Sequence, residues 1–156
     1  MTTHAALYRR RPGTTPRPGQ IRAVWRWLVS CRVAYPDRPA YEGALAAVEW
    51  LVGLSNVPPV TAKTWRALRH LTEVEFMSLD EAKRVRDPRV KAPTNEAIAD
   101  EINAAADMVE VDPNPDNRAY AYGAYALMTW WVGTGELPDE LIPKSSIPPQ
   151  SRSGAA

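Results

Sequence analysis

The chain reads GALAAVEWLVGLSNVP over residues 43–58 and, eighty positions later, GAYALMTWWVGTGELP over residues 123–138. Aligned without a gap, the two copies are identical at seven of sixteen positions, whereas unrelated segments of ordinary composition would share about one. The identical pairs are Gly43/Gly123, Ala44/Ala124, Ala46/Ala126, Trp50/Trp130, Val52/Val132, Gly53/Gly133 and Pro58/Pro138. The repetition predicts one type of helix used twice in an all-α fold.

A single face of each copy carries small residues and a tryptophan. Its members are three, four and three residues apart, so they lie on one helical stripe. They are Gly43, Ala46, Trp50 and Gly53 in the first copy and Gly123, Ala126, Trp130 and Gly133 in the second. A glycine inside a helix costs about 1 kcal/mol relative to alanine, so a glycine in both copies needs a compensating benefit.

Close approach of helix backbones supplies that benefit. We expect the two repeat helices to cross at their glycines, or each stripe to receive the other helix of its own hairpin. Both interpretations place the stripe residues in the core. The functional alternative is a ligand pocket walled by the two tryptophan rings.

Further helices follow from apolar residues at helical spacing. We predict them at residues 21–35, 61–71, 78–87 and 95–109, with Asp37 and Asn117, eighty positions apart, as caps of the repeat helices. The resulting fold is a compact bundle of about five to six helices with an internal two-helix pseudo-repeat. Its predicted parts are a flexible basic arm (1–19), one helical domain (20–142, with repeat units 21–58 and 95–138 and a central insert 61–92) and a disordered tail (143–156).

The second copy lies in a run, AYAYGAYALMTWWV, that is apolar on every face except for Thr129 and the tyrosine hydroxyls. A helix of this kind is central in a bundle or lies in a membrane. The run is shorter than the ~20 residues that span a bilayer. We therefore expect burial within the chain or, as the alternative, a homodimer interface. The first copy keeps Glu42 and Glu49, which predicts that one of its faces is in water.

Catalytic and metal-binding patterns are missing from the sequence. It has two histidines, His4 and His70, and one cysteine, Cys31, too few for a Cys/His metal framework. Neither a G-x-S-x-G elbow nor a glycine-rich nucleotide loop occurs. We therefore predict a protein that is not an enzyme and that needs no cofactor or metal. The single cysteine, expected in the core, and the lack of a visible signal peptide favour the cytoplasm.

Part of the first copy, Tyr41-x-Gly43…Ala47-x-x-Trp50-x-x-Gly53 followed by Pro58, resembles segments of small uncharacterised helical proteins of actinobacteria and their phages. The resemblance covers about a tenth of the chain. It implies a helical fold and a phage or actinobacterial origin, and it implies no activity.

Charge is distributed unevenly along the chain. The net charge is +7 over residues 1–38, +1 over 39–93 and −7 over 94–156. Such asymmetry indicates a basic end that binds a partner, or acidic and basic parts that complement each other within one fold. Arginine-rich arms bind phosphate. The candidate nucleic-acid contacts are Arg9, Arg10, Arg11, Arg17, Lys63, Arg66, Arg69, Lys83, Arg84 and Arg86.

Two functions are therefore predicted. The first is a non-enzymatic, phage-encoded helical protein that acts through protein interaction or self-association, without membrane insertion. The alternative is a small nucleic-acid-binding regulator that uses the N-terminal arginines and the central basic helices.

Overall fold

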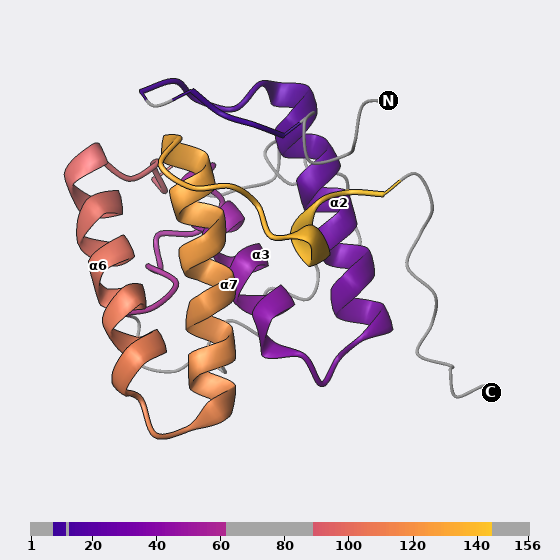
Figure 1. Ribbon diagram of the computed structural model, residues 1–156. Helices are drawn as coiled ribbons and strands as arrows, with labels where there is room; N and C mark the ends of the chain where they lie inside the picture. The colour runs from indigo at the N-terminus through magenta and orange to yellow at the C-terminus, as the bar shows by residue number, and fades with distance from the viewer. Residues whose placement is uncertain (1–7, 12, 62–88, 145–156) are drawn as a thin grey trace.

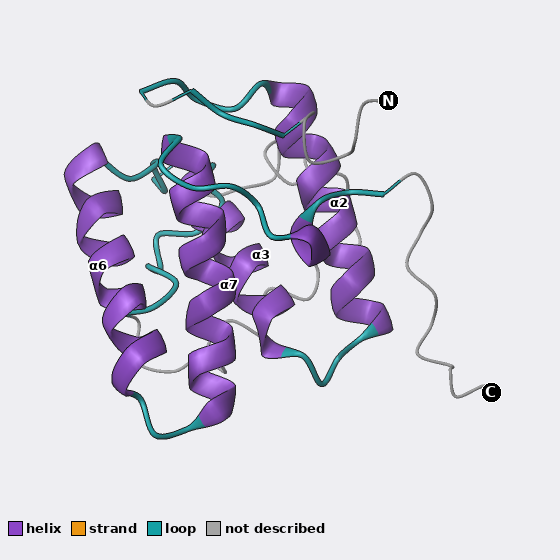
Figure 2. Cartoon of the chain, in the orientation of Figure 1, coloured by secondary structure: helices purple, strands orange, loops and turns teal. Residues whose placement is uncertain are grey.

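The computed structural model describes residues 8–11, 13–61 and 89–144, and this part of the chain is helical, without a β-strand. Its elements are α2 (Pro18–Ala34), α3 (Pro39–Leu51), α6 (Asn95–Val111), α7 (Pro115–Val132) and the short 3-10 helix η2 (Asp139–Leu141) (Figures 1 and 2). The all-α prediction is confirmed. The helices predicted at 61–71 and 78–87 and the tail from 145 onward lie outside the described residues.

Proline in the first turn begins α2, α3 and α7. This position suits proline because the first helical N–H groups have no partner within the helix. The cap of α7 is Asn114, whose side chain accepts a hydrogen bond from the Asp116 N–H at 2.8 Å. The predicted caps were wrong, since Asn117 lies inside α7 and Asp37 lies two residues before the start of α3.

The four helices form two hairpins that pack through their second members. In Figure 1, α3 and α7 lie at the centre, α2 covers α3, and α6 covers α7. The helix η2 returns to α2, where the Trp27 Nε1–H donates to the carbonyl oxygen of Glu140 at 3.1 Å. The apolar helix α7 is therefore buried within the chain between α3 and α6.

The central pair touches backbone to backbone at its glycines. A Cβ on Gly43 would overlap the carbonyl oxygen of Tyr120 on α7, and a Cβ on Gly123 would overlap the carbonyl oxygen of Ala40 on α3. The two contacts are equivalent, because residues 40 and 120 are also eighty positions apart. Of the two arrangements expected from the sequence, the structure has the one in which the repeat helices cross each other.

Both central helices end in the same way. Gly53 and Gly133 have φ angles of 81° and 85°, in the left-handed region that closes helices. The next two N–H groups donate back to one carbonyl: Leu54 and Ser55 to Glu49 at 2.8 and 3.2 Å, Thr134 and Gly135 to Thr129 at 2.9 and 3.1 Å. The two copies thus share local backbone geometry as well as sequence.

The stripe residues lie in or against the core, where Ala46, Trp50, Ala126 and Trp130 are at most 5% exposed. The expectation of a wet face on α3 was wrong at Glu49, which is 4% exposed. Burial raises the pKa of Glu49 to about 8, and the charge of Arg32 on α2 opposes this shift. Burial likewise raises the pKa of Cys31, a core residue of α2, to about 12.

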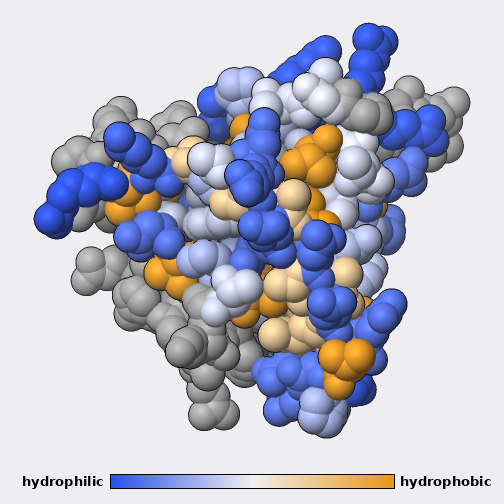
Figure 3. Space-filling model, turned by 90° about the vertical axis from the view of Figure 1, so that its left-hand side faces the viewer, coloured by the Kyte–Doolittle hydropathy of each residue, from blue (hydrophilic) through white to orange (hydrophobic). Residues whose placement is uncertain are grey.

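The outer surface differs from this core. Hydrophilic side chains predominate on the face shown in Figure 3, and hydrophobic ones form small separate patches there. Within the described ranges, no helix combines the length and apolarity needed to cross a bilayer.

Candidate functional site

The N-terminal segment, residues 8–11 and 13–17, lies across the C-terminal end of α7 (Figure 1). The Trp130 Nε1–H donates to the carbonyl oxygen of Tyr8 at 2.6 Å, and the two rings lie 6.3 Å apart between centroids. Farther along, the Gly13 N–H reaches the Val132 carbonyl oxygen at 3.5 Å. These contacts connect the described part of the predicted basic arm (1–19) to α7, because a buried indole N–H requires an acceptor. The flexibility expected for the arm stays a prediction.

Arg10 is the most constrained arginine of this segment. Its guanidinium lies 5.9 Å from the centroid of the Trp130 ring, within range of a cation–π interaction. One of its amino groups donates to the Thr14 carbonyl oxygen at 2.6 Å. Its Nε is buried and has no hydrogen-bond partner among the described residues. Desolvation lowers the pKa of Arg10 from its ordinary value. A buried donor of this kind costs about 1–3 kcal/mol until it finds an acceptor.

A polar hollow of about 580 Å³ lies beside Arg10. Its lining consists of four arginines, two threonines and one glutamine: Arg9, Arg10, Arg11, Arg17, Thr14, Thr15 and Gln20. None of the described residues in this lining carries a carboxylate. The described part of the chain also places no acidic side chain within salt-bridge distance of the four guanidinium groups. We call this cavity the arginine hollow.

Local hydrogen bonds shape the arginine hollow. The Thr14 N–H and hydroxyl both donate to the Arg11 carbonyl oxygen, at 3.1 and 2.7 Å, which closes a tight turn at Gly13. The Arg17 N–H donates to the Gln20 side chain at 2.9 Å where α2 begins. The first turn of α2 carries no acidic residue, so the positive end of its dipole adds to the charge of the arginines.

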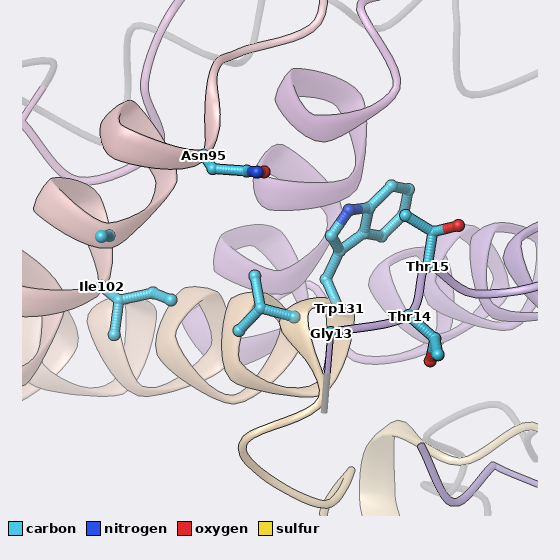
Figure 4. A pocket seen from close by; sticks show the side chains of 8 residues that line it. Gly13, Thr14, Thr15, Asn95, Ile102 and Trp131 are labelled. Atoms are coloured by element: carbon cyan, nitrogen blue, oxygen red, sulfur yellow. The ribbon is translucent and has the colours of Figure 1, made fainter. Parts of the chain in front are cut away.

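A second hollow, of about 380 Å³, is drawn in Figure 4 and shares the lining residues Thr14 and Thr15 with the first. We call it the apolar hollow. Its walls are Asn95, Ala99 and Ile102 from α6, Trp131 and Val132 from α7, and residues 13–15. In Figure 4, the Asn95 side chain extends from the start of α6 toward the indole of Trp131. Because Thr14 and Thr15 line both hollows, the segment that contains them forms a shared wall.

The structure brings together part of the predicted nucleic-acid set. Arg9, Arg10, Arg11 and Arg17 line one hollow. Lys63, Arg66, Arg69, Lys83, Arg84 and Arg86 lie outside the described residues. Sequence reasoning missed Trp131, although the repeat alignment contains a signal for it: Trp131 stands where the first copy has Leu51.

No group of three or more histidine, cysteine, aspartate or glutamate side chains in the described ranges is arranged to hold a metal ion.

Comparison of the chain with protein-family models, curated proteins and solved structures finds no match. The resemblance to helical proteins of actinobacteria and their phages therefore remains a prediction.

Proposed function

We propose that the protein binds the phosphate backbone of nucleic acid through the arginine hollow. The observation that carries this proposal is the gathering of four arginines around one cavity, with no acidic group among the described residues that line it. Like charges placed together repel one another, so an anion that enters the hollow relieves an unfavourable electrostatic energy.

The geometry of guanidinium groups supports phosphate as the anion. Arginine presents a planar fork of N–H donors that matches two phosphate oxygens at once. The hydroxyl of Thr15 adds a neutral hydrogen-bonding group to the same lining, while the Thr14 hydroxyl already donates to the Arg11 carbonyl oxygen. A chain of phosphates favours several arginines over one, because each neutralised phosphate releases counterions.

The scaffold under this site belongs to the same proposal. We propose that it is a duplicated two-helix unit, within a bundle of five to six helices in the full chain. The equivalent glycine contacts and helix ends support duplication, as do the equal lengths of α2 and α6, each 17 residues. The cytoplasmic location, the phage origin and the absence of enzymatic activity stay predictions.

The protein-interaction or assembly role, which the sequence placed first, has less support. The most exposed large hydrophobic side chains are Val33, Val111 and Tyr122, at 53%, 75% and 38%. They stand on three different helices, α2, α6 and α7. The described residues thus offer scattered apolar side chains and not one interface, so this role is our second proposal.

A salt-dependent binding titration tests the first proposal. We expect the protein to bind a labelled 20-nucleotide DNA at about 50 mM salt and to lose affinity steeply by about 200 mM. The double variant Arg9→Ala/Arg11→Ala, at two exposed arginines of the hollow, removes two phosphate contacts. The slope of log affinity against log salt should fall by about 0.9 for each contact in duplex and about 0.7 in single strands.

The matched control is Arg26→Ala, an exposed arginine on α2 that does not line the hollow. It removes one positive charge from α2, where the double variant removes two from the N-terminal segment, and its binding should stay close to that of the wild type. No binding at 50 mM salt would contradict the proposal. So would an equal loss per charge in Arg26→Ala and in the double variant.

A further inference from the structure

We propose that the bound nucleic acid is single-stranded and that one of its bases enters the apolar hollow beside Trp131. This inference rests on the proposed function, since the arginine hollow supplies the phosphate contacts. It adds the part of the ligand that the arginines cannot recognise.

The first argument is the position of the two hollows. They share the wall formed by Thr14 and Thr15, so a ligand can occupy both by crossing one short segment of chain. A nucleotide has a matching division, with an anionic phosphate at one end and a flat, largely apolar base at the other. The polar and apolar hollows match these two ends in chemistry and in order.

The second argument is the lining of the apolar hollow. Trp131 contributes an aromatic ring, and stacking on aromatic side chains is how proteins bind unpaired bases without sequence preference. Ile102 and Val132 supply aliphatic walls. Asn95 adds one amide that can both donate to and accept from a base edge. The volume of about 380 Å³ lies within the range of about 300–1,000 Å³ typical of small-molecule sites.

The third argument comes from the equivalent position in the other repeat copy. Leu51 is 4% exposed in the core. Trp131, at the same place on α7, is only partly buried and lines a cavity. A large aromatic ring beside an open hollow keeps apolar surface in water and so loses part of the free energy that burial would give. A ligand that covers the ring removes this surface from water.

A base inside a duplex cannot fill this hollow. Its faces are stacked on neighbouring bases and its pairing edge is occupied, whereas unpaired bases can be splayed out and stacked on protein side chains. The arrangement therefore favours single strands. Phosphate and base are common to DNA and RNA, and the two are separate arms of the experiment.

The experiment measures fluorescence anisotropy with labelled dT10, rU10 and a ten-base-pair duplex at one salt concentration. We expect the wild type to bind at least one single strand about tenfold more tightly than the duplex. Trp131→Leu installs the residue of the first copy and should lose this preference while duplex affinity stays within about twofold. Trp27→Leu, at a partly buried tryptophan on α2 away from the hollow, is the matched control and should keep the preference.

A second variant keeps the inference testable if Trp131→Leu fails to fold. Ala99→Leu fills the apolar hollow from an exposed position of α6 and leaves Trp131 in place. It should also remove the preference for single strands. Equal binding of single strand and duplex by the wild type would overturn the inference, as would equal weakening of both ligands in Trp131→Leu.

The two proposals fail in different ways. If Arg9→Ala/Arg11→Ala weakens all ligands while Trp131→Leu and Ala99→Leu change nothing, base entry is wrong and phosphate binding stands. If the wild type binds none of the three ligands at low salt, both proposals are wrong.

Discussion

The C-terminal ends of α3 and α7 have the same backbone geometry and different surroundings. At the end of α3, Leu51 is buried, and the chain continues to residues held by the carboxylate of Glu101 on α6. That carboxylate accepts from the Val60 N–H, the Thr61 N–H and the Thr61 hydroxyl at 2.5, 3.0 and 2.7 Å. At the end of α7, Trp131 lines a hollow and the N-terminal segment lies across the helix.

The end of α3 thus belongs to the packed scaffold, and the end of α7 belongs to the candidate site. Both helices end at a left-handed glycine, which carries no side chain. The helix-closing residue itself therefore does not distinguish the two ends. Beyond Gly53, the side chains of Ser55, Pro59 and Val60 are buried, whereas Asn56 and Thr61 are exposed. At α7 an arginine-rich segment arrives from the other end of the chain and leaves two hollows open. The same helix end can therefore serve packing in one place and binding in another.

The largest effect should come from the two equivalent tryptophans. Trp50→Ala and Trp130→Ala should each lower the free energy of unfolding by about 3–5 kcal/mol, because each removes a buried ring. Only Trp130→Ala should also release the N-terminal segment, since Trp130 alone binds Tyr8 and Arg10. Limited trypsin digestion should then show faster cleavage after Arg9 in this variant at a temperature where both are folded.

The control for this release is Trp130→Phe, which keeps a ring but removes the N–H donated to Tyr8. It should speed cleavage after Arg9 at a smaller cost in stability. Equal cleavage rates in the Trp50 and Trp130 variants would show that the N-terminal segment does not depend on α7.

A smaller but still large effect is expected at the helix crossing. Gly43→Ala and Gly123→Ala should each destabilise the protein by about 3 kcal/mol, because the new methyl group must displace a carbonyl of the facing helix. Urea denaturation measures this difference. Gly19→Ala in α2, where a Cβ would meet open space, is the matched control and should be neutral or stabilising by up to about 1 kcal/mol.

The equivalence of the two contacts sets a stricter condition. The costs at Gly43 and Gly123 should agree within about 1 kcal/mol, since each methyl group meets the same kind of atom. A large cost at one site and none at the other would contradict a symmetric crossing.

A last effect should appear as a pH dependence of the free energy of unfolding at Glu49, whose equivalent on α7 is Thr129. The Thr129 hydroxyl donates to helix carbonyls and does not titrate in this range. The folded-state pKa of Glu49, about 8, lies above its ordinary value of 4.5, so the folded state holds the proton more tightly than the unfolded state. The stabilisation that protonated Glu49 gives the folded state is fully present below about pH 4.5. It is lost as the pH rises toward 8, by about 1.4 kcal/mol per pH unit.

Denaturation of wild type and Glu49→Gln at pH 5, 6, 7 and 8 measures this loss. The glutamine variant keeps the shape of the side chain, and it should gain stability over the wild type as the pH rises. The groups that face Glu49 are Arg32 of α2 and the Tyr120 hydroxyl of α7, and both remain in the variant. Parallel pH profiles would show that Glu49 is ionised in the folded protein.

Much of the scaffold could be predicted from the sequence. Helical spacing of apolar residues predicted 21–35 and 95–109, and the structure has Pro18–Ala34 and Asn95–Val111. The paired glycines predicted a close helix crossing because their cost requires a contact that only a missing side chain permits. The N-caps were misplaced since proline, which needs no N–H partner, takes the first turn of α3 and α7.

The site was predictable only in part. The four arginines were identified as phosphate contacts from their composition, but nothing in their spacing showed that they line a common hollow. Glu49 looked like a surface residue because charge favours water. Its burial depends on which helices cover α3.

Local periodicity and the helix-closing glycines thus determine which segments are helical, which faces are apolar and where α3 and α7 end. These properties depend on neighbours within a few residues of each other, so they can be read along the chain. The site depends on a contact between Tyr8 and Trp130, which are 122 residues apart. Only the tertiary structure decides such a contact, because it forms where a buried N–H and an uncovered helix end remain after the hairpins have packed.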